Sequence, residues 1–197
     1  MTKFTNFAAA ALVFSLAACG GSAPDAGPPP LEGARMGGAF SLINQDGKTT
    51  TEKDFTGKYR LIYFGYTFCP DICPVDAQLM GQALTLLEKE DKARAAKLVP
   101  IFISVDPARD TPAIVKQFVS NFHPRMVGLT GSVAQIDEMA QRYGVAFMRD
   151  KPNAQGAYLV NHARMIVLYG PPGEPIAIMP QCDDPKAVVA ELARWVR

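Results

Sequence analysis

Short apolar runs alternate along the chain with longer stretches in which apolar residues recur at helical spacing. Residues 59–64 and 98–105 are apolar at nearly every position, as strands buried on both faces of a sheet are. Shorter apolar segments that we expect to be strands occupy residues 126–129, 146–148, 165–169 and 176–179. Near the start, residues 40–44 and 48–51 flank a polar turn with a glycine, which predicts a β-hairpin.

Helical patterns fill the intervals between these runs. Leucines at helical spacing predict a helix that ends near Glu90, and Asp110-Thr111-Pro112 combines a capping residue with proline in a first turn. Ser132 caps a third predicted helix, and Asp184-Pro185 opens a last one. Strands and helices that alternate in this way, and close with a strand hairpin and a helix, predict an α/β domain. We expect a thioredoxin-like fold with an extra N-terminal β-hairpin.

The first eighteen residues have the pattern of an export signal rather than of folded structure. Lys3 supplies a basic start, residues 7–16 are apolar, and Leu16-Ala17-Ala18 precedes Cys19. The apolar stretch is too short to span a bilayer as a mature helix. Small residues directly before a cysteine resemble a bacterial lipobox, so we expect residues 1–18 to be a lipoprotein signal peptide and Cys19 to be lipidated. An ordinary signal peptide or an uncleaved anchor is the alternative.

A lipid at Cys19 would hold the protein on the periplasmic face of a bacterial membrane. Residues 19–35 are rich in glycine and proline and are expected to form a flexible tether. Residues 36–197 suit one domain that is large enough to bury a core. The net charge is only +1, and no basic run is interleaved with aromatic residues, so the composition gives no reason to expect nucleic-acid binding.

The number of cysteines restricts the chemistry. The chain has four, and lipidation of Cys19 leaves Cys69, Cys73 and Cys182, an odd number that suggests a reactive or metal-bound thiol. Outside the reducing cytosol an unliganded pair of thiols tends to oxidise. The pair is therefore either kept reduced by a partner or protected by a metal.

Cys69 and Cys73 lie just after the first buried strand, and each precedes a proline. Because a residue before proline avoids helical geometry, we expect a tight turn with Cys73 as N-cap and Pro74 as the first helical residue. Both sulfurs would then lie near a helix N-terminus, which favours thiolate over thiol. Thiolate is the form that binds metals and also the form that attacks disulfides, so both functions remain open at this point.

The position of His162 favours a metal site over a redox-active pair of thiols. Dithiol oxidoreductases of thioredoxin type have two residues between their cysteines and a cis-proline in the facing loop. Here three residues intervene, and the facing segment 158–162 has no proline and ends in His162. Two thiolates and an imidazole form a soft-to-borderline set that suits Cu(I) and can hold Cu(II), although zinc fits the same ligands. The alternative is a simple disulfide with a bystander histidine.

Several motifs together resemble the Sco/SenC family. They are Tyr-Phe-Gly-Tyr-Thr-Phe-Cys-Pro-Asp-Ile-Cys-Pro (63–74), Ile-Ser-Val-Asp-Pro-Ala-Arg-Asp-Thr-Pro (103–112), Phe-His-Pro (122–124), Gly-Leu-Thr-Gly (128–131) and His162. Members of that family are membrane-anchored, thioredoxin-like copper proteins that help to build the dicopper CuA centre of cytochrome c oxidase. The resemblance implies that Cys69, Cys73 and His162 are copper ligands.

The resemblance also implies a partner, subunit II of cytochrome c oxidase, with another copper chaperone or a thiol reductase as further partners. The protein would deliver copper to that subunit as a metallochaperone rather than an enzyme, or keep the subunit's cysteines reduced with Cys69 and Cys73 as a redox pair. A dedicated thiol–disulfide reductase and a copper sensor or buffer remain alternatives. The family has Asp before the ligand histidine and Ser or Thr after it, where this chain has Asn161 and Ala163. We expect Asn161 to remove a negative charge from the site and so to weaken its preference for Cu(II).

Two further residues are candidates for the site. In this topology Cys182 follows a strand that returns toward the metal side of the sheet, where it would be a fourth ligand or a resolving thiol. The alternative is that Cys182 has no role in the site and is only a small residue just before the last helix. Asp106 follows its strand at the same sheet edge as Cys69. It is a candidate acceptor behind the ligands or part of a partner-facing surface, or else an Asp-Pro turn that stabilises its own loop.

Overall fold

The computed structural model describes residues 27–182 and 184–197, so the predicted signal peptide, Cys19 and the first part of the tether lie outside the described residues. The strands of the main sheet are β1 (Ser41–Asn44), β2 (Thr49–Thr51), β3 (Tyr59–Gly65), β4 (Leu98–Ser104), β5 (Val127–Thr130), β8 (Ile166–Tyr169) and β9 (Pro175–Ile178). Their order across the sheet is β2-β1-β5-β4-β3-β8-β9. The predicted N-terminal hairpin is confirmed as β1 and β2, which pair antiparallel at one edge of the sheet.

The two long apolar runs form neighbouring strands in the middle of the sheet. β3 and β4 are parallel, with Gly65 opposite Ser104, so their carboxyl ends meet at one edge. β5 continues the parallel order, whereas β8 runs antiparallel to β3. Nearly every residue of β3 and β4 is buried, which confirms the prediction of strands covered on both faces. Loops at the edge where parallel strands end are the usual place for a binding site in such sheets.

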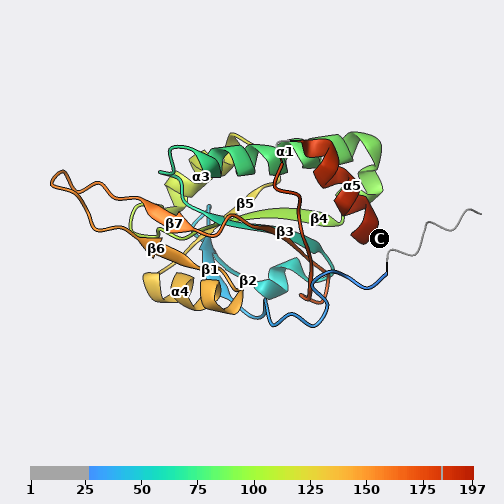
Figure 1. Cartoon of the computed structure of the whole chain (residues 1–197), viewed down its shortest axis with the longest axis horizontal. Helices are drawn as coiled ribbons and strands as arrows, with labels where there is room; N and C mark the ends of the chain where they lie inside the picture. The colour runs from blue at the N-terminus through green and yellow to red at the C-terminus, as the bar shows by residue number, and fades with distance from the viewer. Residues whose placement is uncertain (1–26, 183) are drawn as a thin grey trace, which may run out of the picture.

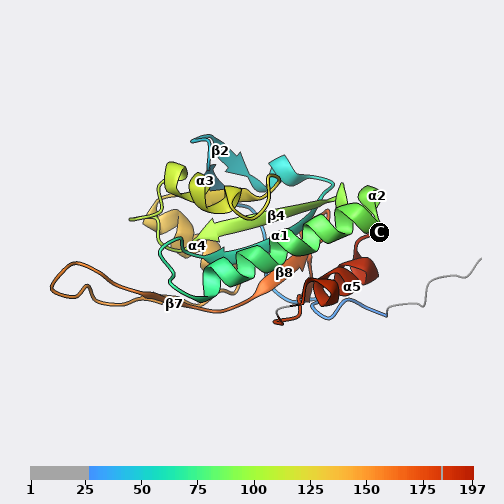
Figure 2. The same ribbon diagram turned by 90° about the horizontal axis from the view of Figure 1, so that it is seen from above.

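The helices are α1 (Ile72–Glu90), α2 (Lys92–Ala95), α3 (Pro112–Ser120), α4 (Val133–Arg142) and α5 (Pro185–Trp195), together with a 3-10 helix at Glu52–Phe55. α1 and α5 lie side by side over one face of the sheet, and α4 lies on the opposite face (Figures 1 and 2). The predicted cap at Ser132 is confirmed, since its hydroxyl accepts a hydrogen bond from the Gln135 N–H. None of the helices within the described part of the chain is long and apolar enough to cross a membrane.

A two-stranded ribbon stands apart from the main sheet. β6 (Phe147–Arg149) pairs antiparallel with β7 (Val160–His162), and the connection between them projects beyond one end of the molecule (Figures 1 and 2). Residues 158–162 were expected to be a loop, but their second half is this strand, with His162 opposite Phe147. The pairing gives the backbone N–H and C=O groups of both segments hydrogen-bond partners. In a loop at the same place these groups would have to bond to water.

Candidate metal centre

The three sequence-predicted ligands come together at the carboxyl edge of β3. Cys69 and Cys73 follow β3 across the turn that leads into α1, and His162 ends β7. The two sulfurs and an imidazole nitrogen lie within 4.8 Å of one another, and Cys73 Sγ is 3.2 Å from His162 Nε2. This spacing is close enough for the three side chains to form a metal site.

The helix behind the cysteines begins earlier than predicted. α1 starts at Ile72, so Cys73 lies inside the first turn and is not the N-cap, and Pro74 is the third helical residue. A proline is tolerated there because the first N–H groups of a helix have no intrahelical partner. Asp71, at the N-cap position, makes no side-chain capping bond, whereas Cys69 Sγ accepts a hydrogen bond from the Cys73 N–H at 3.4 Å. The first cysteine thus takes over part of the capping role.

The two thiols have unequal environments. Cys73 is completely buried, and burial raises the pKa of its thiol far above the usual value. Cys69 is only partly buried. Burial also acts to raise the pKa of Cys69, but hydrogen bonds from the N–H groups of Asp71 and Cys73 outweigh it, and the pKa lies below its ordinary value. Cys69 is therefore the more accessible and the more acidic of the two thiols, and Cys73 is the buried one.

His162 has the tautomer that a metal ligand needs. Its Nδ1 lies 3.2 Å from the Ala163 carbonyl oxygen, which can only accept, so Nδ1 carries the proton and Nε2 turns its lone pair toward Cys73. Burial lowers the pKa of His162 below its ordinary value, which keeps the imidazole neutral near pH 7. The rings of Tyr63 and Tyr66 meet it edge-on, with centroids 6.0 and 6.1 Å away. These contacts fix the orientation of the imidazole.

A buried ion pair connects the cysteine helix to the histidine strand. Asp76 lies one turn after Cys73 on α1, and its carboxylate accepts hydrogen bonds from Arg164, two residues after His162, at 2.7 to 3.1 Å. The Asp76 side chain is 2% exposed and that of Arg164 is 31% exposed. The pair therefore fixes the distance between the elements that carry the ligands.

The turn before Cys69 is held by a second buried carboxylate. Asp110 accepts hydrogen bonds from the N–H and the hydroxyl of Thr67 at 2.9 and 2.6 Å, and from the Ser104 hydroxyl at 2.5 Å. Burial raises the pKa of Asp110, although the same hydrogen bonds act to lower it. The carboxylate ties the ligand-bearing turn to the end of β4.

Asp106 braces a neighbouring cluster and is not one of the three grouped ligand side chains. It is fully buried, accepts a hydrogen bond from the Tyr158 hydroxyl at 2.7 Å and forms an ion pair with Arg109. The Arg109 guanidinium stacks on the Tyr158 ring, 3.7 Å from its centroid, and donates to the Tyr158 carbonyl. Phe68 covers the same guanidinium at 5.1 Å. The cluster thus joins the loop after β4, the turn before Cys69 and the ribbon that carries His162.

Cys182 is not grouped with the ligand atoms, and Asn161 lies on the exposed side of its strand. The Cys182 side chain is exposed and is not among the atoms that come within 4.8 Å of one another. Asn161 is exposed on β7, and its amide donates to Asp150 at 3.0 Å across the ribbon. Because successive side chains of a strand point to opposite faces, Asn161 faces away from the side of His162. This orientation argues against the expectation that Asn161 changes the charge at the ligands.

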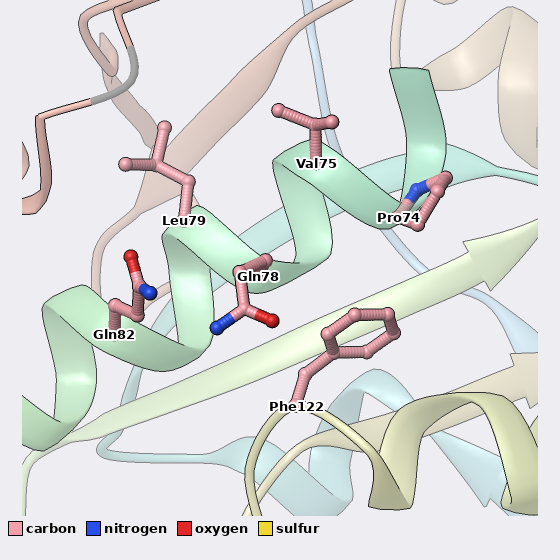
Figure 3. Close-up of a pocket in the computed structure, with 6 residues that line it drawn as sticks. All are labelled: Pro74, Val75, Gln78, Leu79, Gln82 and Phe122. Atoms are coloured by element: carbon pink, nitrogen blue, oxygen red, sulfur yellow. The ribbon is translucent and has the colours of Figure 1, made fainter. Parts of the chain in front are cut away.

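An apolar groove begins beside the site. It runs along α1 toward the end of α3, has a volume of about 350 Å³, and is shown in Figure 3. The residues that line it are Pro74, Val75, Gln78, Leu79, Gln82 and Phe122. Val75, at its start, is 40% exposed, and Phe68, on the ligand-bearing turn, is 51% exposed. Exposed apolar side chains therefore lie on the turn before Cys69 and on the helix after Cys73.

Sequence reasoning missed the Asp76–Arg164 pair and the Tyr158–Arg109 contact. Asp76 gave one usable signal, because it lies three residues after Cys73 and four before Met80, on what becomes the buried face of α1. A carboxylate on such a face needs a buried partner. Its partner is 88 residues away in sequence, so no local pattern identifies Arg164.

Comparisons with known proteins agree with this site. The SCO1/SenC family model matches residues 28–197. The mitochondrial SCO1 homolog 1 of Arabidopsis thaliana is 41% identical over 143 residues, which cover 73% of this chain and 42% of that protein. SenC of Rhodobacter capsulatus is 40% identical over 138 residues, or 70% and 60% of the two chains. The chain spans about half the length of the curated relatives it matches.

Solved structures give the same result. The structure of Bradyrhizobium japonicum ScoI with copper bound has a TM-score of 0.74 and 38% identity, and the match covers 81% of this chain and 99% of that one. Yeast Sco1 with copper bound has the same TM-score with 35% identity, over 82% and 88% of the two chains. These neighbours confirm the predicted thioredoxin-like fold. With a family match that extends from residue 28 to the last residue, this chain belongs to the SCO1/SenC family.

Proposed function

We propose that this protein binds copper through Cys69, Cys73 and His162 and delivers it to subunit II of cytochrome c oxidase during assembly of the CuA centre. The observation that carries the proposal is the grouping of two sulfurs and a neutral imidazole within 4.8 Å, on a fold whose relatives include copper-bound Sco structures. Soft thiolates favour Cu(I), and the imidazole allows Cu(II) as well. A lipid at Cys19 would hold the protein on the periplasmic face of the membrane, next to an oxidase that works there.

The inequality of the two thiols supports delivery rather than storage. Cys73 is the buried ligand, whereas Cys69 and His162 are partly exposed, and of the two thiols Cys69 has the lower pKa. A thiolate from a partner would approach copper on the exposed side and replace Cys69 first. The apolar groove that begins at Pro74 and the exposed ring of Phe68 offer contact area to such a partner.

Copper loading tests the first half of the proposal. The purified protein receives one equivalent of Cu(II), and its optical and EPR spectra are recorded. We expect an intense thiolate-to-copper charge-transfer band that is lost in Cys69→Ala and in His162→Ala. Matched controls are Cys182→Ser, which removes an exposed thiol, and His123→Asn, which replaces the other of the two histidines and can still accept from the Arg125 N–H. A band that survives His162→Ala would refute the ligand set.

Copper transfer tests the second half. The copper-loaded protein is mixed with a purified soluble fragment of oxidase subunit II that lacks its metal, and the CuA absorption of the fragment is followed. We expect copper to move to the fragment. Tight binding without transfer would indicate a sensor or buffer and would refute the delivery function.

Thiol–disulfide exchange is a second candidate, favoured by the lowered pKa of Cys69. The Cys69 thiolate would attack a disulfide of the partner and form a mixed disulfide, and the partner would release one thiol. Cys73 would then displace the partner's second thiol and form the Cys69–Cys73 disulfide, so that two electrons pass to the partner. A thiol reductase would restore the pair. Reduction that is fully retained in His162→Ala, in a protein that fails to transfer copper, would favour this candidate.

A further inference from the structure

Tyr63 has a buried hydroxyl without a hydrogen-bond partner, right behind the proposed ligands. Its side chain is 0% exposed, and no atom of the described residues forms a hydrogen bond with its oxygen. A buried hydroxyl that is left unpaired destabilises a protein relative to one that is paired. Few such groups occur in native proteins, and one beside a functional site calls for a role in another state of that site.

The surroundings of the hydroxyl contain two acceptors. Tyr63 and Gly65 point to the same face of β3, and a Cβ added at Gly65 would lie 2.9 Å from Tyr63 Cε1 and 3.1 Å from Cys73 Sγ. The Tyr63 ring and the Cys73 sulfur therefore pack together over the backbone of Gly65. Asp76 is the second acceptor, since its charge acts on the Tyr63 hydroxyl. A phenol hydroxyl is a hydrogen-bond donor at neutral pH.

The Asp76 carboxylate already has donors. Arg164 makes three contacts with its two oxygens, which offer about four acceptor sites. The Cys73 sulfur, by contrast, becomes an acceptor when a metal displaces its proton. A thiolate in a fully buried position needs a donor, because an uncompensated buried charge is costly. The hydroxyl can rotate to supply one.

We propose that Tyr63 is a positioning residue that donates a hydrogen bond to the Cys73 thiolate in the metal-loaded site and thereby favours Cu(I) over Cu(II). The proposal rests on the proposed copper function. A hydrogen bond to a thiolate withdraws electron density from the sulfur and weakens its donation to the metal. Cu(II) depends on that donation more than Cu(I) does. The hydroxyl therefore shifts the site toward the oxidation state in which thiolates exchange copper.

Tyr63→Phe removes only the hydroxyl and tests the idea. Affinities for Cu(I) and Cu(II) are measured by competition with chelators of known affinity, and the charge-transfer band is recorded. We expect the ratio of Cu(II) to Cu(I) affinity to rise by up to roughly tenfold, because the ratio contains only the difference between the hydrogen bond's strengths in the two copper states. We also expect the band to move to lower energy, because the sulfur electrons are less stabilised. Since the hydroxyl has no partner before loading, the apo variant should unfold at the same temperature or higher.

Tyr143→Phe is the matched control. Tyr143 is also buried, at 1% exposure, but its hydroxyl donates to the Gly38 carbonyl at 2.9 Å. We expect this variant to lose stability and to keep the wild-type affinity ratio and band, the reverse of Tyr63→Phe. An unchanged ratio and band in Tyr63→Phe, with copper still bound by the wild type, would overturn the role of Tyr63 alone. Failure of the wild type to bind copper would overturn the proposed function and this inference together.

Discussion

The ion pair of Asp76 and Arg164 predicts that removing one partner destabilises the protein more than removing the other. Asp76 is almost inaccessible, whereas nearly a third of the Arg164 side chain is exposed. Arg164→Met leaves the carboxylate buried without its cation, and breaking a buried pair in this way costs about 3–5 kcal/mol. Partial exposure of the pair puts the expected loss of unfolding free energy near the lower end, about 3 kcal/mol. Asp76→Asn leaves the cation where water can reach it, and we expect a loss of only about 1–2 kcal/mol.

Urea unfolding followed by the fluorescence of Trp195, the one tryptophan of the chain, measures both variants. For a domain of this size the larger loss corresponds to a fall in melting temperature of about 6–12 °C. The double variant should be more stable than Arg164→Met alone, since it no longer buries an unpaired charge. Copper affinity should fall with Arg164→Met as well, because His162 lies two residues away on the same segment. Equal losses in the two single variants, or a loss below about 1 kcal/mol for Arg164→Met, would refute the reasoning.

Other predictions follow from the remaining site contacts. Asp110→Ala removes the acceptor of three hydrogen bonds, and urea unfolding should show a loss of about 3 kcal/mol together with weaker copper binding. Asn161→Asp should leave Cu(II) affinity unchanged within twofold in a chelator competition, because its side chain faces away from the site. Alkylation of the apo protein with iodoacetamide should label Cys69 well before Cys73. The rate of labelling should rise with pH as the Cys69 thiolate forms. Labelling of Cys73 first, as located by mass spectrometry, would contradict the directions of the two pKa shifts. Since burial lowers the pKa of His162, Cu(II) should stay bound as the pH falls through about 6.5, where a free imidazole protonates, and the EPR signal should be lost only below that pH.

The parts of the fold that the sequence predicted are those with a local signal. The apolar runs at 59–64 and 98–105 have to be buried on both faces, and that requirement alone places them in the middle of a sheet. Cys69 and Cys73 follow from the first run, because they come directly after its end. The start of α1 was misplaced because the prediction took Pro74 as the first helical residue, whereas proline occupies the third position here and Asp71 is the N-cap. Pairings over long separations, such as that between Asp76 and Arg164, depend on the folded arrangement and leave no trace in periodicity.

The ribbon of β6 and β7 has a kinetic consequence. Both cysteines are fixed to the main body through β3 and α1, whereas the histidine belongs to a two-stranded unit outside the main sheet. In the proposed copper site the imidazole would be held in place by contacts between the main body and residues beside the ribbon, namely the Asp76–Arg164 pair and the stack of Arg109 on Tyr158. A partner that binds the projecting connection between β6 and β7 (Figure 1) would therefore act on the rate of metal exchange without touching either cysteine.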